Sequence, residues 1–185
     1  MTAGGAASAA GPIQGVALGV VKAQAAQGKK VSPAAVLYDQ TANPDANAVT
    51  SQNFEASFDV YDNSAADDFT VPAGVKWKIT KVVAPGAYYN GTGPMNSVDV
   101  TFYKNSGGLP GAVACTALGV VPTDDGLGNI EAKVKCTLKK GKYFVGVVAN
   151  MDFLVGGQWG WGMQTVGAGF GAAWQNPLGG FGTPC

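Results

Sequence analysis

Apolar and polar residues alternate with a period of two in several short segments of the chain. In segment 75–79, Val, Trp and Ile alternate with two lysines, and in segment 98–103, Val, Val and Phe alternate with Asp, Thr and Tyr. Successive side chains of a β-strand point to opposite faces, so this pattern is typical of a half-buried strand. The sequence therefore predicts strands that bury one face each.

Other segments extend the same interpretation. We predict further strands at 53–60, 67–71, 112–121, 130–138, 142–149 and 158–166. Segment 142–149 is apolar on both faces, which is typical of a central strand. Pro72-Ala73-Gly74 predicts a turn, and Asp124-Asp125-Gly126 predicts a hairpin between segments 112–121 and 130–138. This spacing predicts an all-β, jelly-roll-like β-sandwich.

The first 35 residues have a different composition. They are rich in Ala and Gly, and they predict a mostly irregular N-terminal arm or linker before a sandwich domain at 36–185. Gly15 and Gly19 weaken a helical interpretation. An arm that adds a strand to a neighbouring copy would use its apolar side chains, Ile13, Val16, Leu18, Val20 and Val21. The alternative is a flexible leader.

The composition excludes several classes of function. The chain has 12 basic and 12 acidic residues, every basic residue is a lysine, and there is no histidine. Without arginine and without net positive charge, the chain is a poor nucleic-acid binder. Without histidine, it lacks the commonest general base and cannot build a Ser-His-Asp or Cys-His catalytic set. We therefore expect a protein that is not an enzyme.

Cysteine usage and low charge indicate an extracellular or cell-surface protein. Cys115, Cys136 and Cys185 match no zinc motif, and we predict a Cys115–Cys136 disulfide; three unpaired thiols are the alternative. Cys185 is left over and could pair with another chain. No apolar run is long enough to span a membrane. No lysine precedes Lys22, so we expect that a leader was removed if the protein is secreted.

Several motifs together resemble a module found in secreted and surface proteins of bacteria. They are LYDQ at 37–40, SQNFE at 51–55, ADDFTVPAG at 66–74, GGLPG at 107–111, NMDF at 150–153, GQWGW at 157–161 and AWQNP at 173–177. The resemblance covers about four fifths of the chain, from Val36 to Cys185. It implies a β-sandwich, export, and a binding, adhesive or structural role, with no catalytic residues.

Acidic residues cluster early in the domain. Asp59, Asp62, Asp67 and Asp68 lie within ten positions, and carboxylates from an irregular loop are typical calcium ligands. The alternative is that they cap turns and bond backbone amides. A glycosidase would need two opposed carboxylates, for example Glu55 or Glu131 with Asp59 or Asp152, but no spacing places such a pair.

Aromatic residues offer a binding hypothesis. Trp159 and Trp161 are two apart and would share one face of a strand. An exposed platform could stack on sugar rings while amide side chains bond the hydroxyl groups. The candidate ligand-binding residues are Trp159, Trp161, Trp174, Gln158, Gln175 and Asn176, with Phe170, Phe181, Tyr88, Tyr89 and Asn90 as further candidates. The alternative is that the paired tryptophans fill the core.

Two functions from different classes follow. We expect an extracellular, non-enzymatic structural protein that self-assembles into a fibre or surface structure, as a homo-oligomer or polymer, through its N-terminal arm. The alternative is a carbohydrate-binding, lectin-like adhesion module that recognises glycans with or without calcium. Sugar binding needs exposed aromatic side chains on a folded monomer, whereas assembly needs the arm.

Overall fold

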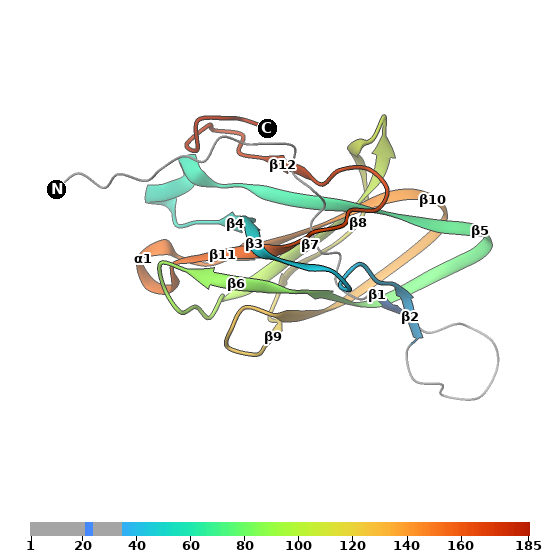
Figure 1. Cartoon of the computed structure of the whole chain (residues 1–185), viewed down its shortest axis with the longest axis horizontal. Coiled ribbons are helices and arrows are strands. Elements are labelled where there is room, and N and C mark those ends of the chain that lie inside the picture. The colour runs from blue at the N-terminus through green and yellow to red at the C-terminus, as the bar shows by residue number, and fades with distance from the viewer. Residues whose placement is uncertain (1–20, 24–34) are drawn as a thin grey trace.

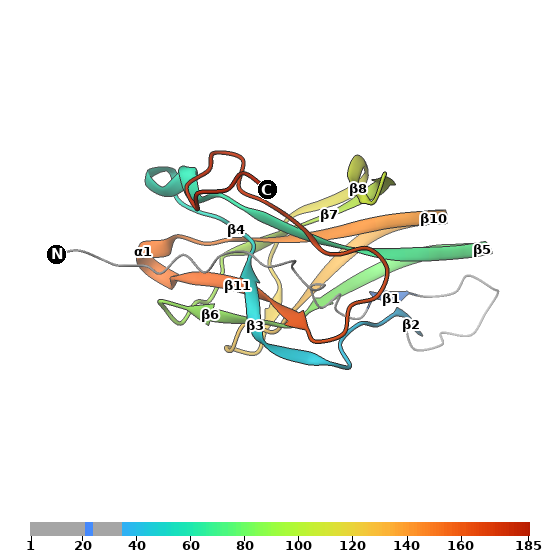
Figure 2. The ribbon, with the colours of Figure 1, turned by 45° about the horizontal axis from the view of Figure 1, so that its top comes forward.

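Two long strands organise the fold. β5 (Ser64–Ala84) and β10 (Ile130–Asn150) each contain 21 residues and pair antiparallel from one end to the other. Both strands fold back at the same place. The first half of each strand therefore lies in one layer of a sandwich, and the second half lies in the other layer (Figures 1 and 2). The structure is a computed structural model, and it describes residues 21–23 and 35–185.

The strand pairing builds two sheets. The larger has the order β2 (Ala35–Tyr38), β1 (Val21–Ala23), β5, β10, β7 (Ser97–Ser106) and β8 (Leu109–Val120), with β4 (Gln52–Asn53), β9 (Thr123–Asp124) and β12 (Ala173–Gln175) attached to β10, β10 and β5. The smaller has the order β3 (Pro44–Thr50), β11 (Gln158–Gln164) and β6 (Gly86–Tyr89). All pairs are antiparallel except β4 with β10. This arrangement confirms the predicted all-β sandwich.

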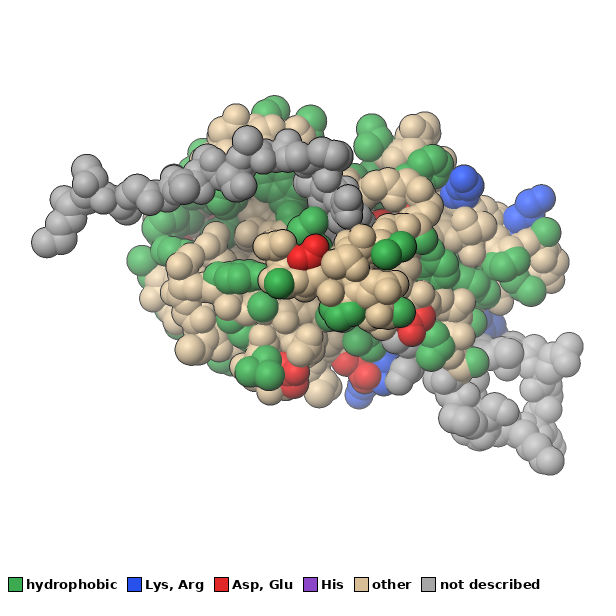
Figure 3. All heavy atoms as spheres, viewed as in Figure 1, with side chains coloured by type: hydrophobic (Ala, Val, Ile, Leu, Met, Phe, Trp, Pro, Cys, Tyr) green, Lys and Arg blue, Asp and Glu red, His purple; other side chains and the backbone are tan. Residues whose placement is uncertain are grey.

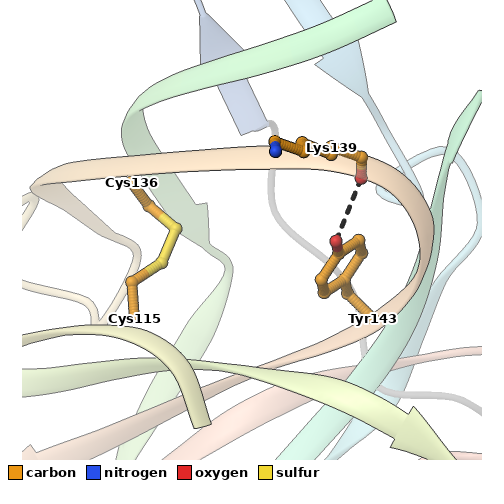
Figure 4. Close-up of a disulfide and its surroundings, with 4 residues drawn as sticks. All are labelled: Cys115, Cys136, Lys139 and Tyr143. Atoms are coloured by element: carbon orange, nitrogen blue, oxygen red, sulfur yellow. Dashed lines mark hydrogen bonds between the residues drawn. A yellow bond between two sulfur atoms is a disulfide. The ribbon is translucent and has the colours of Figure 1, made fainter. Parts of the chain in front are cut away.

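A corner interrupts the long ladder. Lys139 pairs with Lys76 and Gly141 pairs with Val71, so residues 72–75 of β5 have only Lys140 opposite them. The Tyr143 hydroxyl donates a hydrogen bond to the Lys139 carbonyl at 3.0 Å, across this bend of β10 (Figure 4). The predicted turn at 72–74 is therefore a corner within one continuous strand. The prediction that a strand ends there is wrong.

The core lies between the two layers. In β7 the predicted alternation is confirmed, because Val98, Val100 and Phe102 are buried while the residues between them are partly exposed. In β5, Trp77 and Ile79 are buried but Val75 is 47% exposed, because it belongs to the corner. Burial of these aromatic and branched side chains is the main favourable term for the fold.

Two predictions about the strands differ from the structure, and one short helix was not predicted. Segment 53–60 is not a strand, because a 3₁₀ helix, η1 (Ala56–Tyr61), follows β4. A four-residue helix, α1 (Phe153–Gly156), precedes β11. Segments 112–121 and 130–138 do not pair, because β8 pairs with β7, and the hairpin before β10 is made by the short β9.

The predicted disulfide is confirmed. Cys115 of β8 is bonded to Cys136 of β10, with Cα atoms 6.1 Å apart (Figure 4). β7 lies between β8 and β10 in the sheet order, so the bond joins two strands that do not share a ladder. Cys136 is buried, and the bond therefore ties the edge strand to the core.

Removing this bond is expected to lower stability by about 3 kcal/mol, because a cross-link across 21 positions restricts the unfolded chain. The test is the urea midpoint of a Cys115→Ser/Cys136→Ser double variant under non-reducing conditions. Cys185→Ser is the control, since that thiol is free and exposed. An unchanged midpoint in the double variant would contradict the prediction.

Candidate functional site

The structure buries the tryptophan pair that was predicted to bind sugar. Trp159 and Trp161 of β11 are both 0% exposed. The Trp159 indole Nε1 donates to the Gly128 carbonyl at 2.9 Å, and its backbone N–H donates to Gln52 Oε1 at 2.7 Å. The prediction that these two residues form an exposed platform is wrong. They complete the core where the smaller sheet packs on the larger one.

The other predicted ligand residues separate into two groups. Asn176 is fully buried, and its Nδ2 donates to the Val60 and Asp62 carbonyls at 2.9 and 2.8 Å, so it anchors the C-terminal loop rather than a ligand. Gln158 Oε1 accepts from Asn90 Nδ2 at 2.8 Å. Trp174 and Gln175 of β12 are partly or largely exposed and line a groove described below.

The four predicted calcium ligands are not brought together. Asp62 Oδ1 accepts from the Phe54 backbone N–H at 2.8 Å, which fixes the segment before η1. Asp67 and Asp68 lie on opposite faces of β5, because strand side chains alternate. In the part of the chain that the structure describes, no group of three or more acidic, histidine or cysteine side chains could hold a metal ion. The predicted four-carboxylate site is therefore wrong.

Asp67 is instead a buried acid within the sandwich. It shares the inner face of β5 with Ala65 and Phe69 and is 0% exposed. Its Oδ1 accepts from the Asp68 backbone N–H at 2.9 Å, but its Oδ2 is buried without a partner among the described residues. Burial raises the pKa of Asp67 to about 8, and the neighbouring Asp68 carboxylate adds to the rise.

The polar neighbours of Asp67 from β2 and the segment after it are partly buried. Gln40 Nε2 donates to the Tyr38 hydroxyl at 2.7 Å and to the Asp68 carbonyl at 3.3 Å, while Gln40 Oε1 has no partner among residues 35–185. Burial raises the pKa of Tyr38, and both aspartates contribute to that rise. On the outer face, burial also raises the pKa of Asp68, although the Phe170 N–H and Lys142 oppose it.

The two glutamates make structural contacts. Glu55 accepts hydrogen bonds from the Phe153 and Leu154 backbone N–H groups at the start of α1. Desolvation opposes ionisation of Glu55, but these backbone N–H groups outweigh it and lower its pKa. Glu131 forms an ion pair with Lys81. Both carboxylates therefore join segments that are distant in the sequence.

The edge strand β8 is a long apolar surface. β8 pairs only with β7 among the described strands, so its outer edge carries unpaired backbone groups. Val113 and Leu118 are 56% and 66% exposed. Segment 105–123 contains no charged residue. The apolar composition of this segment is visible in the sequence, but its exposure and its position at the sheet edge are not.

Two hollows are lined by residues in the described part of the chain. The larger, of about 260 Å³, lies on the outer face of β5, β10, β7 and β8 beside β12. The smaller, of about 190 Å³, lies among η1, α1 and the C-terminal loop and is lined by five aromatic rings and one amide, from Phe54, Phe58, Tyr61, Phe153, Phe181 and Gln158. The larger hollow combines polar and aromatic groups from five strands.

Most of the predicted assembly arm lies outside the described residues. This applies to Ile13, Val16, Leu18 and Val20, whereas Val21 is the first residue of β1.

No helix in the described ranges has the length and hydropathy needed to span a membrane. Comparison of the chain with known protein families, with curated proteins and with solved structures finds no significant match.

Proposed function

We propose that this chain is an extracellular structural protein that self-assembles by adding a strand to the outer edge of β8. The observation that carries the proposal is the length and composition of that edge. β8 has 12 residues, exposes apolar side chains and lies in a segment without charge. The disulfide is compatible with the oxidising conditions outside a cell.

An edge of this kind is unusual in a monomer. Natural sheets protect their edges with lysine, proline, bulges or a covering segment, because unpaired N–H and C=O groups recruit other strands. β8 has irregular register with β7 and one proline, Pro110, near its start. The rest of β8 carries none of the charges that would oppose pairing. A partner strand would satisfy the backbone groups and cover Val113 and Leu118.

The proposed occupant is the N-terminal arm of a neighbouring copy. The donated segment is residues 1–20, which precede β1 and contain no charged residue. Charge repulsion therefore does not oppose its addition to the uncharged edge of β8.

The arm leads into β1, which lies near one edge of the large sheet, while β8 forms the other edge. Donation from one edge region to the opposite edge is a heterologous contact, and a heterologous contact that does not close into a ring makes a filament. This arrangement predicts head-to-tail growth.

Charging the edge is expected to stop growth. In the full chain, a Val113→Lys/Leu118→Lys variant should remain monomeric at concentrations where the unmodified chain forms fibres or defined oligomers, by light scattering and negative-stain microscopy. Leu154→Lys/Val155→Lys is the matched control, because these residues of α1 are 75% and 83% exposed and lie away from β8.

A variant lacking residues 1–20, which retains β1, tests the arm itself. It should be monomeric and should still cap growth when mixed with the unmodified chain, since its own β8 remains free. If the unmodified chain is monomeric, or if the charged β8 variant assembles as the unmodified chain does, the proposed function fails.

A further inference from the structure

The larger hollow has features of a binding groove, and it is separate from the outer edge of β8. It lies on the outer face of the large sheet, and β12 borders it where Ala173–Gln175 pairs with Ser64–Ala66 of β5. Its floor comes from alternate residues of β7 and β10, which point away from the core. Segments 64–66, 99–103, 146–148 and 173–175 therefore converge on one site.

The polar groups of the groove are held in place by the sheet. Asp99 Oδ1 accepts from the Gly119 backbone N–H at 2.7 Å and from Asn150 Nδ2 at 3.2 Å, while the other carboxylate oxygen takes part in neither bond. Gln175 Nε2 donates to Ser64 Oγ at 3.1 Å, which fixes the amide beside the groove. The hydroxyls of Thr101 and Tyr103 complete the polar set. Fixed donors and acceptors favour a ligand rich in hydroxyl groups.

The apolar part of the groove is a flat surface beside an aromatic ring. Gly146 lies at its centre, and a Cβ at that position would be 3.2 Å from the Ala65 carbonyl and 3.5 Å from the Tyr103 ring. The missing side chain leaves one face of the groove open next to Tyr103. Trp174 adds apolar surface, because its Nε1 is already bonded to the Thr50 carbonyl at 2.9 Å. An aromatic ring beside open space suits the C–H face of a sugar.

The charge of the lining restricts the ligand further. Among the residues that the structure describes, no lysine lines the groove, and Asp99 is the one acidic side chain there. A phosphate, sulfate or carboxylate ligand would meet no cation among these residues and would be repelled by Asp99. A volume of about 260 Å³ lies just below the range of typical drug-sized pockets, about 300–1,000 Å³. The groove therefore fits a short stretch of a neutral ligand.

We propose that this groove binds neutral carbohydrate, with the Tyr103 ring stacking on a sugar face and Asp99, Thr101 and Gln175 bonding its hydroxyl groups. Strand addition uses the edge of β8, whereas this site uses the face of the sheet, so the proposal does not depend on self-assembly. It also differs from the sequence-based expectation, in which Trp159 and Trp161 carried the binding.

The test is binding of the full chain to an array of neutral and acidic oligosaccharides, followed by calorimetry with cellopentaose, laminaripentaose, xylopentaose and mannopentaose. We expect saturable binding to at least one neutral oligosaccharide and none to the acidic ones. Tyr103→Ala should weaken binding at least tenfold, whereas Tyr103→Phe, which retains the ring, should stay within about threefold of the unmodified chain. Tyr89→Ala is the aromatic control on β6, away from the groove.

Two outcomes overturn the proposal directly, and a third requires a further variant. Failure of every neutral oligosaccharide to bind removes the ligand class, and binding that Tyr103→Ala leaves unchanged removes the site. An equal loss of affinity in Tyr103→Ala and Tyr89→Ala would show a general effect on folding. In that case the affinity of Asp99→Asn, an isosteric change, decides whether the groove is the binding site. That variant should retain the urea midpoint but lose affinity, and unchanged affinity would exclude the groove.

Discussion

The free energy of unfolding is expected to fall as the pH rises from about 4 to 8, because Asp67 keeps its proton in the folded state. The pKa of this carboxyl is about 8 in the fold, against 3.8 without the surrounding protein. Between these values the unfolded chain has released a proton that the folded chain retains. Stability then decreases by up to about 1.4 kcal/mol per pH unit, and below about pH 4 both states are protonated and the penalty disappears.

The chain offers a clear window for this measurement. It has no histidine, which would otherwise titrate in this range. Asp68 and Asp62, whose pKa values burial also raises, act in the same direction as Asp67. Glu55 and Asp125 have lowered pKa values and act in the opposite direction, but only at the acid end of this pH range and below it. Tyr38, which lies near Asp67, titrates above the window.

Asp67→Asn tests the assignment. The amide keeps the shape and an acceptor for the Asp68 N–H, but it has no proton to release, so most of the fall in stability between pH 5 and 8 should disappear, and only the contributions of Asp68 and Asp62 should remain. At pH 8 the variant should be more stable than the unmodified chain in urea unfolding followed by tryptophan fluorescence. Asp152→Asn, an exposed carboxylate, should keep the original slope. If the free energy of unfolding of Asp67→Asn still falls with pH as steeply as that of the unmodified chain, another group carries the retained proton.

The second large effect is expected at Trp159. Trp159→Ala should destabilise the fold by about 3–5 kcal/mol, because it leaves a large cavity in the core. It also leaves the buried Gly128 carbonyl without its indole donor. Trp159→Phe should be less severe, since it fills part of the volume but does not restore that hydrogen bond.

The measurement is the urea midpoint of both variants beside Trp174→Phe, whose ring is only partly buried. Because Trp159 is more deeply buried than Trp174, Trp159→Ala is expected to be the least stable of the three variants. If Trp159→Ala unfolds at the midpoint of the unmodified chain, the residue is not part of the core, and a role in sugar binding would regain support.

Local patterns in the sequence were sufficient to predict part of the fold. The alternation at 98–103 predicted β7 and its buried face, and the spacing of Cys115 and Cys136 in apparent strands predicted their disulfide. The 3₁₀ helix was missed because Phe54 and Phe58 were taken as strand positions. Their separation of four residues also places both side chains on one face of a strand, and Phe54 lies before η1, so this spacing did not distinguish the two elements.

The remaining features depend on register and on distant partners. Asp67 lies inside the sandwich because it pairs with Val145 of β10, a strand more than 60 positions away in the chain. The groove needs five strands in register before Asp99, Tyr103 and Gln175 become neighbours. The tryptophans of β11 are spaced equally well for an exposed platform or for the core, and only the packing of the smaller sheet decides between them.

The distribution of lysine gives the molecule two unlike ends. Lysines flank the corner of the long ladder at Lys76, Lys78, Lys139, Lys140 and Lys142. Figure 3 shows lysine side chains gathered at that end of the viewed face. Asp59 and Asp152 lie on η1 and beside α1, at the opposite end in Figures 1 and 2.

The disulfide has a mechanical consequence for a filament of this design. A pull between the arm and β8 enters through β1, passes to β5 and then to β10. From there Cys136–Cys115 carries the load to β8 directly and bypasses the ladder between β10 and β7. Tension would reach β8 at Cys115 through a covalent bond rather than only through the hydrogen bonds between β7 and β8.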